Sequence, residues 1–180
     1  MDVLEPFDHG KGYFTFTNLV VKLVSAGKML GVAESCTGGM ISSLLTSVPG
    51  SSDWFKGGVV AYSNETKEML LGVNPKTIAK YGAVSEKTAQ EMAAGARLAL
   101  GVECSLAVTG IAGPGGGTPG KEVGTVCFAW DINGKVSSET KKFSGTRKDV
   151  RLEAVRHALD GLLDRMGSCA CSKAAKTMPA

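Results

Sequence analysis

Histidine is scarce in this 180-residue sequence, and several common catalytic motifs are missing. Only His9 and His157 are present. His9 lies in an N-terminal segment that we expect to be irregular, and His157 lies within a helical pattern, so a nucleophile activated by histidine has little support. The motifs H-E-x-x-H and G-x-x-x-x-G-K-[ST] do not occur. Zinc proteolysis and P-loop nucleotide hydrolysis therefore have no basis in the sequence.

Long apolar runs and a strong net charge are also missing. No run approaches the roughly 18 apolar residues of a membrane-spanning helix. The N-terminal stretch "MDVLEPFDHGKGYF" carries acids where a signal peptide needs basic and apolar residues. The net charge is +3, from 20 Lys and Arg against 17 Asp and Glu. We therefore expect a cytoplasmic protein without a nucleic-acid or membrane partner, whose charge would not repel a phosphorylated small molecule.

The cysteines do not form a disulfide or zinc pattern. Their number is odd and their spacing irregular, and we expect buried free thiols in a reducing compartment. Cys169 and Cys171 form a C-x-C pair, which supplies only two of the four ligands that zinc usually takes. The five cysteines are Cys36, Cys104, Cys127, Cys169 and Cys171.

Short apolar runs of strand length alternate with helical patterns along the chain. "MLGVAE", "GGVVAY" and "CSLAVT" are typical of strands, and Asn133-Gly134 predicts a hairpin between two later strands. This order predicts a single three-layer α/β domain, with a mixed, mostly parallel sheet, an antiparallel hairpin and helices on both faces. We expect the domain to span 17–166, after an irregular extension (1–16) and before a flexible tail (167–180).

Capping residues predict where several helices begin. Thr17 or Asn18 can cap the first helix, and Ser63 can cap a helix that Gly72 ends. Ser85 is expected to open a further helix. The last helix starts at "TRKD", which resembles a capping box with Asp in place of Glu.

Ser35 is a candidate nucleophile. It follows the apolar run "LGVAE" and precedes Thr37, Gly38 and Gly39 at an expected helix start. Backbone N–H groups at a helix N-terminus can hold a phosphate or an oxyanion, and glycines allow a ligand to approach the backbone. The alternative is that Ser35 or Thr37 simply caps the helix. Cys36 is expected to point to the opposite side from Ser35 and to serve packing.

Lys67 is the candidate base. Lysine can take a proton from serine if burial or neighbouring positive charge lowers its pKa toward neutrality. Lys67 lies about one helical turn beyond the end of a strand, and Tyr62 lies at that end, where open α/β sheets gather ligands. The Tyr62 hydroxyl could relay a proton or hold the lysine. The alternative is that Tyr62 packs and Lys67 is a solvated helix residue.

A glycine-rich stretch follows the third expected strand. "TGIAGPGGGTPGK" holds more glycines than a simple connection between strands needs, which favours a loop that wraps a polar ligand over a merely flexible one. Arg147 could add a guanidinium for a carboxylate or phosphate. The alternative is that Arg147 is a solvated residue in the first turn of the last helix.

Five ordered stretches resemble the C-terminal domain of the CinA (competence/damage-inducible protein) family. They cover roughly residues 18–165. They are "AESCTGG", "GSSDWFKGGVVAYSNETK", "GAVSEKTAQEMA", "AVTGIAGPGGGTPGKEVGTV" and "FSGTRKDVR". The resemblance implies a stand-alone nicotinamide mononucleotide deamidase, which converts the carboxamide of the nucleotide to a carboxylate and recycles pyridine nucleotide. It implies no metal or organic cofactor, a nucleotide substrate and a homo-oligomer.

The resemblance also assigns roles to residues. It makes Ser35 the nucleophile and Tyr62 and Lys67 its catalytic partners. It implies substrate contacts by residues near the nucleophile, in the glycine-rich loop and at the last helix, namely Thr37, Gly38, Gly39, Thr109, Gly110, Ala112, Gly113 and Arg147. Two other readings stay open, a nucleotide-binding or interaction module without turnover and an amidase acting on another phosphorylated amide.

Overall fold

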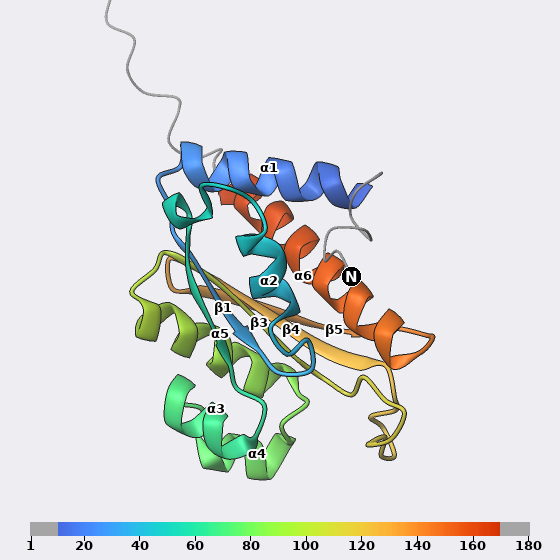
Figure 1. Ribbon diagram of the computed structural model, residues 1–180. Helices are drawn as coiled ribbons and strands as arrows, with labels where there is room; N and C mark the ends of the chain where they lie inside the picture. Colours follow the sequence, from blue (N-terminus) through green and yellow to red (C-terminus); the bar gives the residue numbers. More distant parts are fainter. Residues whose placement is uncertain (1–10, 170–180) are drawn as a thin grey trace, which may run out of the picture.

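A five-stranded mixed sheet lies at the centre of the protein (Figure 1). A computed structural model describes the backbone of residues 11–169 and the side chains of residues 15–167. The strands are β1 (Leu30–Glu34), β2 (Phe55–Val60), β3 (Cys104–Gly110), β4 (Thr125–Ile132) and β5 (Lys135–Lys142). Their order across the sheet is β2-β1-β3-β4-β5. β1 pairs in parallel with β2 and β3, whereas β4 pairs antiparallel with β3 and β5.

Helices cover both faces of the sheet, which confirms the predicted three-layer α/β class (Figure 1). The helices are α1 (Lys11–Ser25), α2 (Met40–Thr46), α3 (Asn64–Leu71), α4 (Pro75–Tyr81), α5 (Glu86–Leu100) and α6 (Arg147–Cys169), with a short 3-10 turn at Ser51–Asp53. α1, α2 and α6 share one hydrophobic cluster with the sheet, and α3, α4 and α5 share the other. No helix of the described residues is long and apolar enough to cross a membrane.

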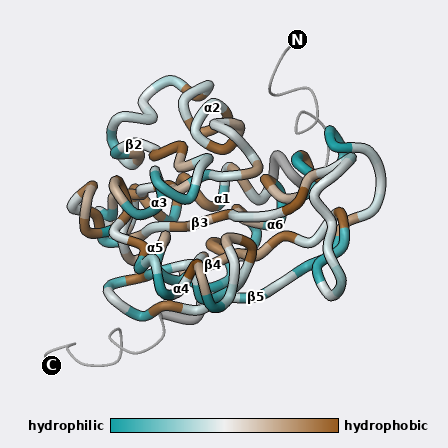
Figure 2. Tube along the Cα trace, turned by 90° about the horizontal axis from the view of Figure 1, so that it is seen from below, coloured by the Kyte–Doolittle hydropathy of each residue, from teal (hydrophilic) through white to brown (hydrophobic). Residues whose placement is uncertain are grey.

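The two faces of the sheet carry side chains of different size. On β3, Leu106 and Val108 point into the cluster beneath α1, α2 and α6, while Ala107 points toward α5. This alternation follows from the two-residue period of a strand. Small residues on the second face let α5 pack closely against the sheet. Figure 2 shows the hydrophobic character concentrated on β3 and low on β5 at the edge of the sheet.

Local signals set several turns as predicted. Asn133 and Gly134 both have positive φ, 54° and 84°, which fits a two-residue hairpin turn between β4 and β5. Ser63 caps α3 through a reciprocal pair with Thr66, and Gly72 ends the helix at a φ of 64°. These caps fix where α3 begins, and therefore where Lys67 lies.

Three expectations about the helices need correction. α1 begins at Lys11, so residues 11–16 are not irregular and Thr17 or Asn18 does not cap the helix. Phe16 explains the earlier start, because it is buried with its ring 6.3 Å from that of Trp54. α6 continues to Cys169, so 167–169 are helical rather than tail.

α4 was not predicted at all, although Asn74 caps it and Pro75 occupies its first turn. Residues 1–10 and 170–180, which include His9 and Cys171, lie outside the described part of the chain.

Candidate active site

The candidate residues gather where the parallel strands end. Ser35 directly follows β1, and its amide donates to Val108 O of β3 at 2.9 Å. Ala61 follows β2, and its amide donates to Glu34 O at 2.8 Å. These bonds extend the sheet by one residue and bring the ends of three strands side by side. Ligands of open α/β sheets collect at this edge.

Ser35 and Lys67 form a buried pair. The Lys67 side chain is only 1% exposed, and its Nζ lies 3.1 Å from Ser35 Oγ. The same Nζ lies 2.9 Å from Ala61 O and 3.4 Å from Tyr62 O. A neutral amine can donate its two hydrogens to these carbonyls, which leaves its lone pair for the Ser35 hydroxyl. Lys67 is therefore not a solvated helix residue.

Burial favours the neutral form of Lys67. Desolvation lowers the pKa of the Lys67 amine, and a Cys36 thiolate would act in the opposite direction. Burial, however, raises the pKa of the Cys36 thiol to about 12. The thiol is thus uncharged near neutral pH, and the effect of burial on Lys67 is unopposed. No carboxylate of the described residues forms an ion pair with Lys67.

A cavity of about 190 Å³ opens above the pair. It is lined by Ser35, Cys36, Tyr62, Asn64, Lys67, Ala83, Val84, Thr109, Gly110, Ala112 and Arg147. Ser35, Tyr62, Lys67, Thr109, Gly110, Ala112 and Arg147 are among the residues that the sequence singled out. Thr37, Gly38, Gly39 and Gly113 do not line it. Cys36 borders the cavity while also belonging to a hydrophobic cluster.

Tyr62 and Arg147 form the outer rim of the cavity. Tyr62 is 62% exposed, and its hydroxyl accepts a hydrogen bond from Arg147 Nη2 at 3.2 Å. Tyr62 reaches Lys67 through its backbone carbonyl and not through this hydroxyl. Arg147 Nη1 also donates to Gly113 O at 2.8 Å, which ties α6 to the glycine-rich loop. Arg147 therefore presents a cation beside the mouth of the cavity.

Thr109 and Gly110 form part of the cavity wall. The Thr109 hydroxyl donates to Ala83 O at 2.9 Å, which holds the segment before α5 against the end of β3. Gly110 has no room for a side chain, because a Cβ would lie 2.9 Å from Thr125 O. The Thr109 hydroxyl hydrogen is thus already used, and Gly110 has no side chain to offer a ligand.

Glu34 occupies the N-terminus of α2, which no pattern in the sequence predicts. Its carboxylate accepts hydrogen bonds from the amides of Gly39 (2.9 Å), Ile41 (3.1 Å) and Ser42 (2.8 Å). Glu34 thus already uses the donors of this helix end that could hold an anion. The substrate contacts expected of Thr37, Gly38 and Gly39 stay a prediction. Neither Ser35 nor Thr37 caps the helix, since Gly39 is the N-cap residue.

Two backbone amides lie directly after Ser35, and of these two residues Cys36 lines the cavity. Within the described residues, the N–H groups of Cys36 and Thr37 make no hydrogen bond to another residue. Gly38 and Gly39 take positive φ values of 58° and 92°, which turns the chain sharply between β1 and α2. The arrangement resembles a strand–turn–helix nucleophile elbow, in which the amide after the nucleophile stabilises an oxyanion.

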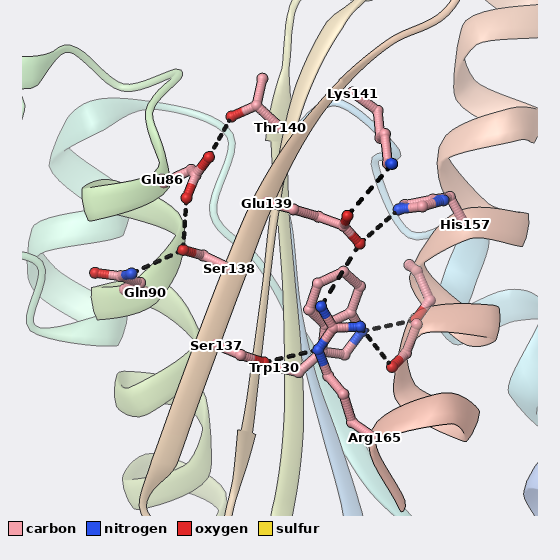
Figure 3. A network of polar contacts seen from close by, with 12 residues as sticks. Glu86, Gln90, Trp130, Ser137, Ser138, Glu139, Thr140, Lys141, His157 and Arg165 are labelled. Carbon is pink, nitrogen blue, oxygen red and sulfur yellow. Dashed lines mark hydrogen bonds and ion pairs between the residues drawn. The ribbon is translucent and has the colours of Figure 1, made fainter. Parts of the chain in front are cut away.

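His157 is engaged elsewhere. Its Nε2 lies 2.9 Å from Glu139 Oε1, and its ring centroid is 4.7 Å from that of Phe128. Figure 3 shows this histidine in a network between α6 and β5, together with Arg165 and Ser137. Within residues 11–169, no cluster of His, Cys, Asp and Glu side chains could hold a metal ion. Within the described residues, the amine that lies beside Ser35 is that of Lys67.

These features define a three-layer α/β domain with a buried serine–lysine pair at the carboxyl edge of its sheet. The chain belongs to the CinA C-terminal domain family, whose match covers residues 15–166.

The CinA-like protein of Mycolicibacterium paratuberculosis is 50% identical over 139 residues, which are 74% of this chain and 32% of that protein. The CinA-like protein of Thermotoga neapolitana is 50% identical over 145 residues, 80% of this chain and 35% of that protein. The chain therefore spans about a third of the length of these curated relatives.

Solved structures share the fold. A CinA superfamily protein from Klebsiella pneumoniae superimposes with a TM-score of 0.85 at 34% identity, covering 88% of this chain and 99% of that one. A CinA superfamily protein from Enterobacter cloacae gives a TM-score of 0.82 at 42% identity, with 84% and 90% covered.

Proposed function

We propose that this chain hydrolyses the carboxamide of nicotinamide mononucleotide to nicotinate mononucleotide and ammonia. The observation that carries the proposal is the 3.1 Å approach of the buried Lys67 amine to the Ser35 hydroxyl at the base of a cavity. A desolvated lysine beside a serine is a recognised way to activate the hydroxyl without histidine. Membership of the CinA family supports the choice of substrate.

The reaction is an acyl transfer in two halves. Neutral Lys67 takes the Ser35 proton while Oγ attacks the carboxamide carbon and forms a tetrahedral intermediate. The protonated Lys67 then gives its proton to the departing nitrogen, so that ammonia leaves and an ester on Ser35 remains. Water then attacks this ester with Lys67 again as base, which releases the carboxylate product and restores the free serine.

The amide of Cys36, which lines the cavity, is the donor that we assign to the oxyanion. It lies immediately after Ser35 and makes no hydrogen bond to another described residue. Loss of one such donor costs about 2.7–4 kcal/mol of transition-state stabilisation in a well-studied protease.

The cavity accommodates only the reactive end of the nucleotide. At about 190 Å³ it is smaller than the roughly 300–1,000 Å³ of pockets that enclose a drug-sized ligand. We place the pyridine carboxamide inside, against Ala83 and Val84, and the phosphate outside, near Arg147 and the glycine-rich loop.

Ammonia release from nicotinamide mononucleotide tests the proposal. We expect activity in the wild type and in Cys36→Ala, and none above background in Ser35→Ala or Lys67→Ala. Activity that survives Ser35→Ala and vanishes in Cys36→Ala would move the nucleophile to the cysteine.

Ligand-induced thermal stabilisation without ammonia release would indicate a binding module instead. Faster turnover of the dephosphorylated nucleoside, or of another phosphorylated amide, would contradict the assigned substrate.

A further inference from the structure

Arg151 contacts the loop that joins β1 to α2 and carries Ser35. It lies on α6 one turn beyond Arg147, and its Nη2 donates to Thr37 O at 2.7 Å. It does not line the cavity. Its Nε is buried without a hydrogen-bond partner, and it forms no ion pair with a carboxylate of the described residues. A partly buried guanidinium without a counter-ion is costly, which favours a role that uses its charge.

A chain of hydrogen bonds links Arg151 to the amide beside the nucleophile. Thr37 O and the Gly38 N–H belong to one planar peptide unit, and Ser35 O and the Cys36 N–H belong to another. The Gly38 N–H donates to Ser35 O at 3.1 Å. Arg151 thus holds Thr37 O, and the Gly38 N–H of the same peptide unit holds Ser35 O.

These linked hydrogen bonds have two consequences for the Cys36 N–H. Fixing Ser35 O also fixes the direction of the Cys36 N–H, because the two are opposite ends of one rigid unit. Charge on the first donor polarises each following bond, so the terminal N–H becomes a stronger donor. Gly38 has a φ of 58°, a conformation that glycine adopts without strain, so the loop can turn to bring these groups together.

We propose that Arg151 is a positioning residue for the reaction, which orients and polarises the Cys36 N–H toward the oxyanion through Thr37 O, Gly38 N–H and Ser35 O. The inference rests on the proposed function, because the oxyanion belongs to that reaction. Its test needs only a Ser35 hydroxyl that reacts with a labelling reagent. Arg151 itself does not touch substrate.

The experiment compares Arg151→Gln, Arg151→Lys and a control, Arg156→Gln. Arg156 lies on the same helix in an ion pair with Glu153, so its replacement removes the same charge away from the loop. The first readout is kcat and KM for nicotinamide mononucleotide. The second is the rate at which diisopropyl fluorophosphate labels Ser35, followed by intact mass.

Labelling with the fluorophosphate does not depend on the natural substrate. The Ser35 Oγ–P bond forms as the P–F bond breaks, fluoride leaves, and the hydroxyl proton passes to Lys67. The phosphoryl oxygen then needs the same donors as an oxyanion. Labelling therefore reports on the Cys36 N–H even if the proposed substrate is wrong.

We expect Arg151→Gln to lower kcat and the labelling rate by about 10- to 100-fold, which is less than the 10²- to 10³-fold loss of a direct donor. KM should stay near that of the wild type, Arg151→Lys should be intermediate, and Arg156→Gln should match the wild type. A merely structural role would lower the melting temperature without separating kcat from KM.

Several results would overturn the inference. They are wild-type rates in Arg151→Gln, a rise in KM alone, an equal loss in Arg156→Gln, or a wild type that is not labelled. If Arg151→Gln does not fold, Arg151→Lys decides, and wild-type rates in that variant refute the role. A wild type that is labelled faster than Arg151→Gln but releases no ammonia would refute the proposed function and leave the role of Arg151 standing.

Discussion

Replacing Lys67 with methionine tests the central step most directly. Methionine keeps most of the length of the side chain and removes the amine that lies 3.1 Å from Ser35 Oγ. A general base contributes about 10²- to 10⁴-fold to a rate, so kcat for ammonia release should fall by that factor, or about 2.7–5.4 kcal/mol. The matched control is Lys76→Met, because Lys76 is an exposed lysine on α4.

The same variant tests whether burial acts on the ionisation of Lys67. Burial lowers the pKa of Lys67 in the folded protein below the 10.5 of an unperturbed lysine. Between these two pKa values the unfolded chain binds a proton that the folded protein does not. The free energy of unfolding therefore rises with pH across this window. Lys67→Met removes this rise, so the stability of the variant relative to wild type should decline as pH approaches 10.5.

Urea unfolding followed by fluorescence of the buried Trp54 and Trp130 measures the effect. Methionine also leaves Ala61 O without its donor, but that loss does not change with pH, so the slope isolates the ionisation. The reasoning is refuted if Lys67→Met keeps kcat close to the wild type while Ser35→Ala is inactive. A stability difference that does not change with pH would refute the assigned effect of burial.

Other predictions concern the surroundings of the pair. The value of kcat/KM should rise with pH through one ionisation below the usual lysine pKa of about 10.4, because only neutral Lys67 accepts a proton, and rate profiles would show it. Cys36→Ala should keep this profile, because the thiol with a pKa of about 12 is neutral throughout, and should lower the free energy of unfolding by about 1 kcal/mol. Glu34→Gln should lower the free energy of unfolding, measured in urea, by about 2–4 kcal/mol, because the amide group turns hydrogens toward several backbone donors. Ser42→Ala removes only one hydrogen bond to Glu34 and should cost about 1 kcal/mol. Arg147→Gln should raise KM about tenfold and change kcat less, and steady-state kinetics that showed the reverse would place Arg147 in the chemical step.

Signals confined to a few neighbouring residues predicted much of the fold. Asn133-Gly134 specified the hairpin because both residues must take positive φ, and Ser63 specified the start of α3 because its hydroxyl accepts from Thr66 N. The beginning of α1 could not be predicted in this way. It depends on Phe16 packing against Trp54, a contact between segments far apart in the chain.

The candidate site was predictable only in part for the same reason. Residues at the ends of the parallel strands, such as Ser35, follow from topology, and the cap of α3 fixes the position of Lys67. The contact of Arg151 with Thr37 joins residues that are 114 positions apart, and no local sequence pattern predicts it. Asn64 lines the cavity from the first turn of α3, and its place directly after the Ser63 cap was the one signal that could have indicated it.

Glu34 determines where the negative charge of a nucleotide can bind. A helix N-terminus after a glycine pair usually attracts phosphate, but here a carboxylate already accepts from Gly39, Ile41 and Ser42. A phosphate placed there would lose those donors and face a like charge at close range. Arg147 is the cation at the mouth of the cavity, and it is tied to the glycine-rich loop through Gly113 O. The proposed nucleotide must therefore direct its phosphate outward toward Arg147, which leaves the inner end of the cavity for the uncharged carboxamide beside Ser35.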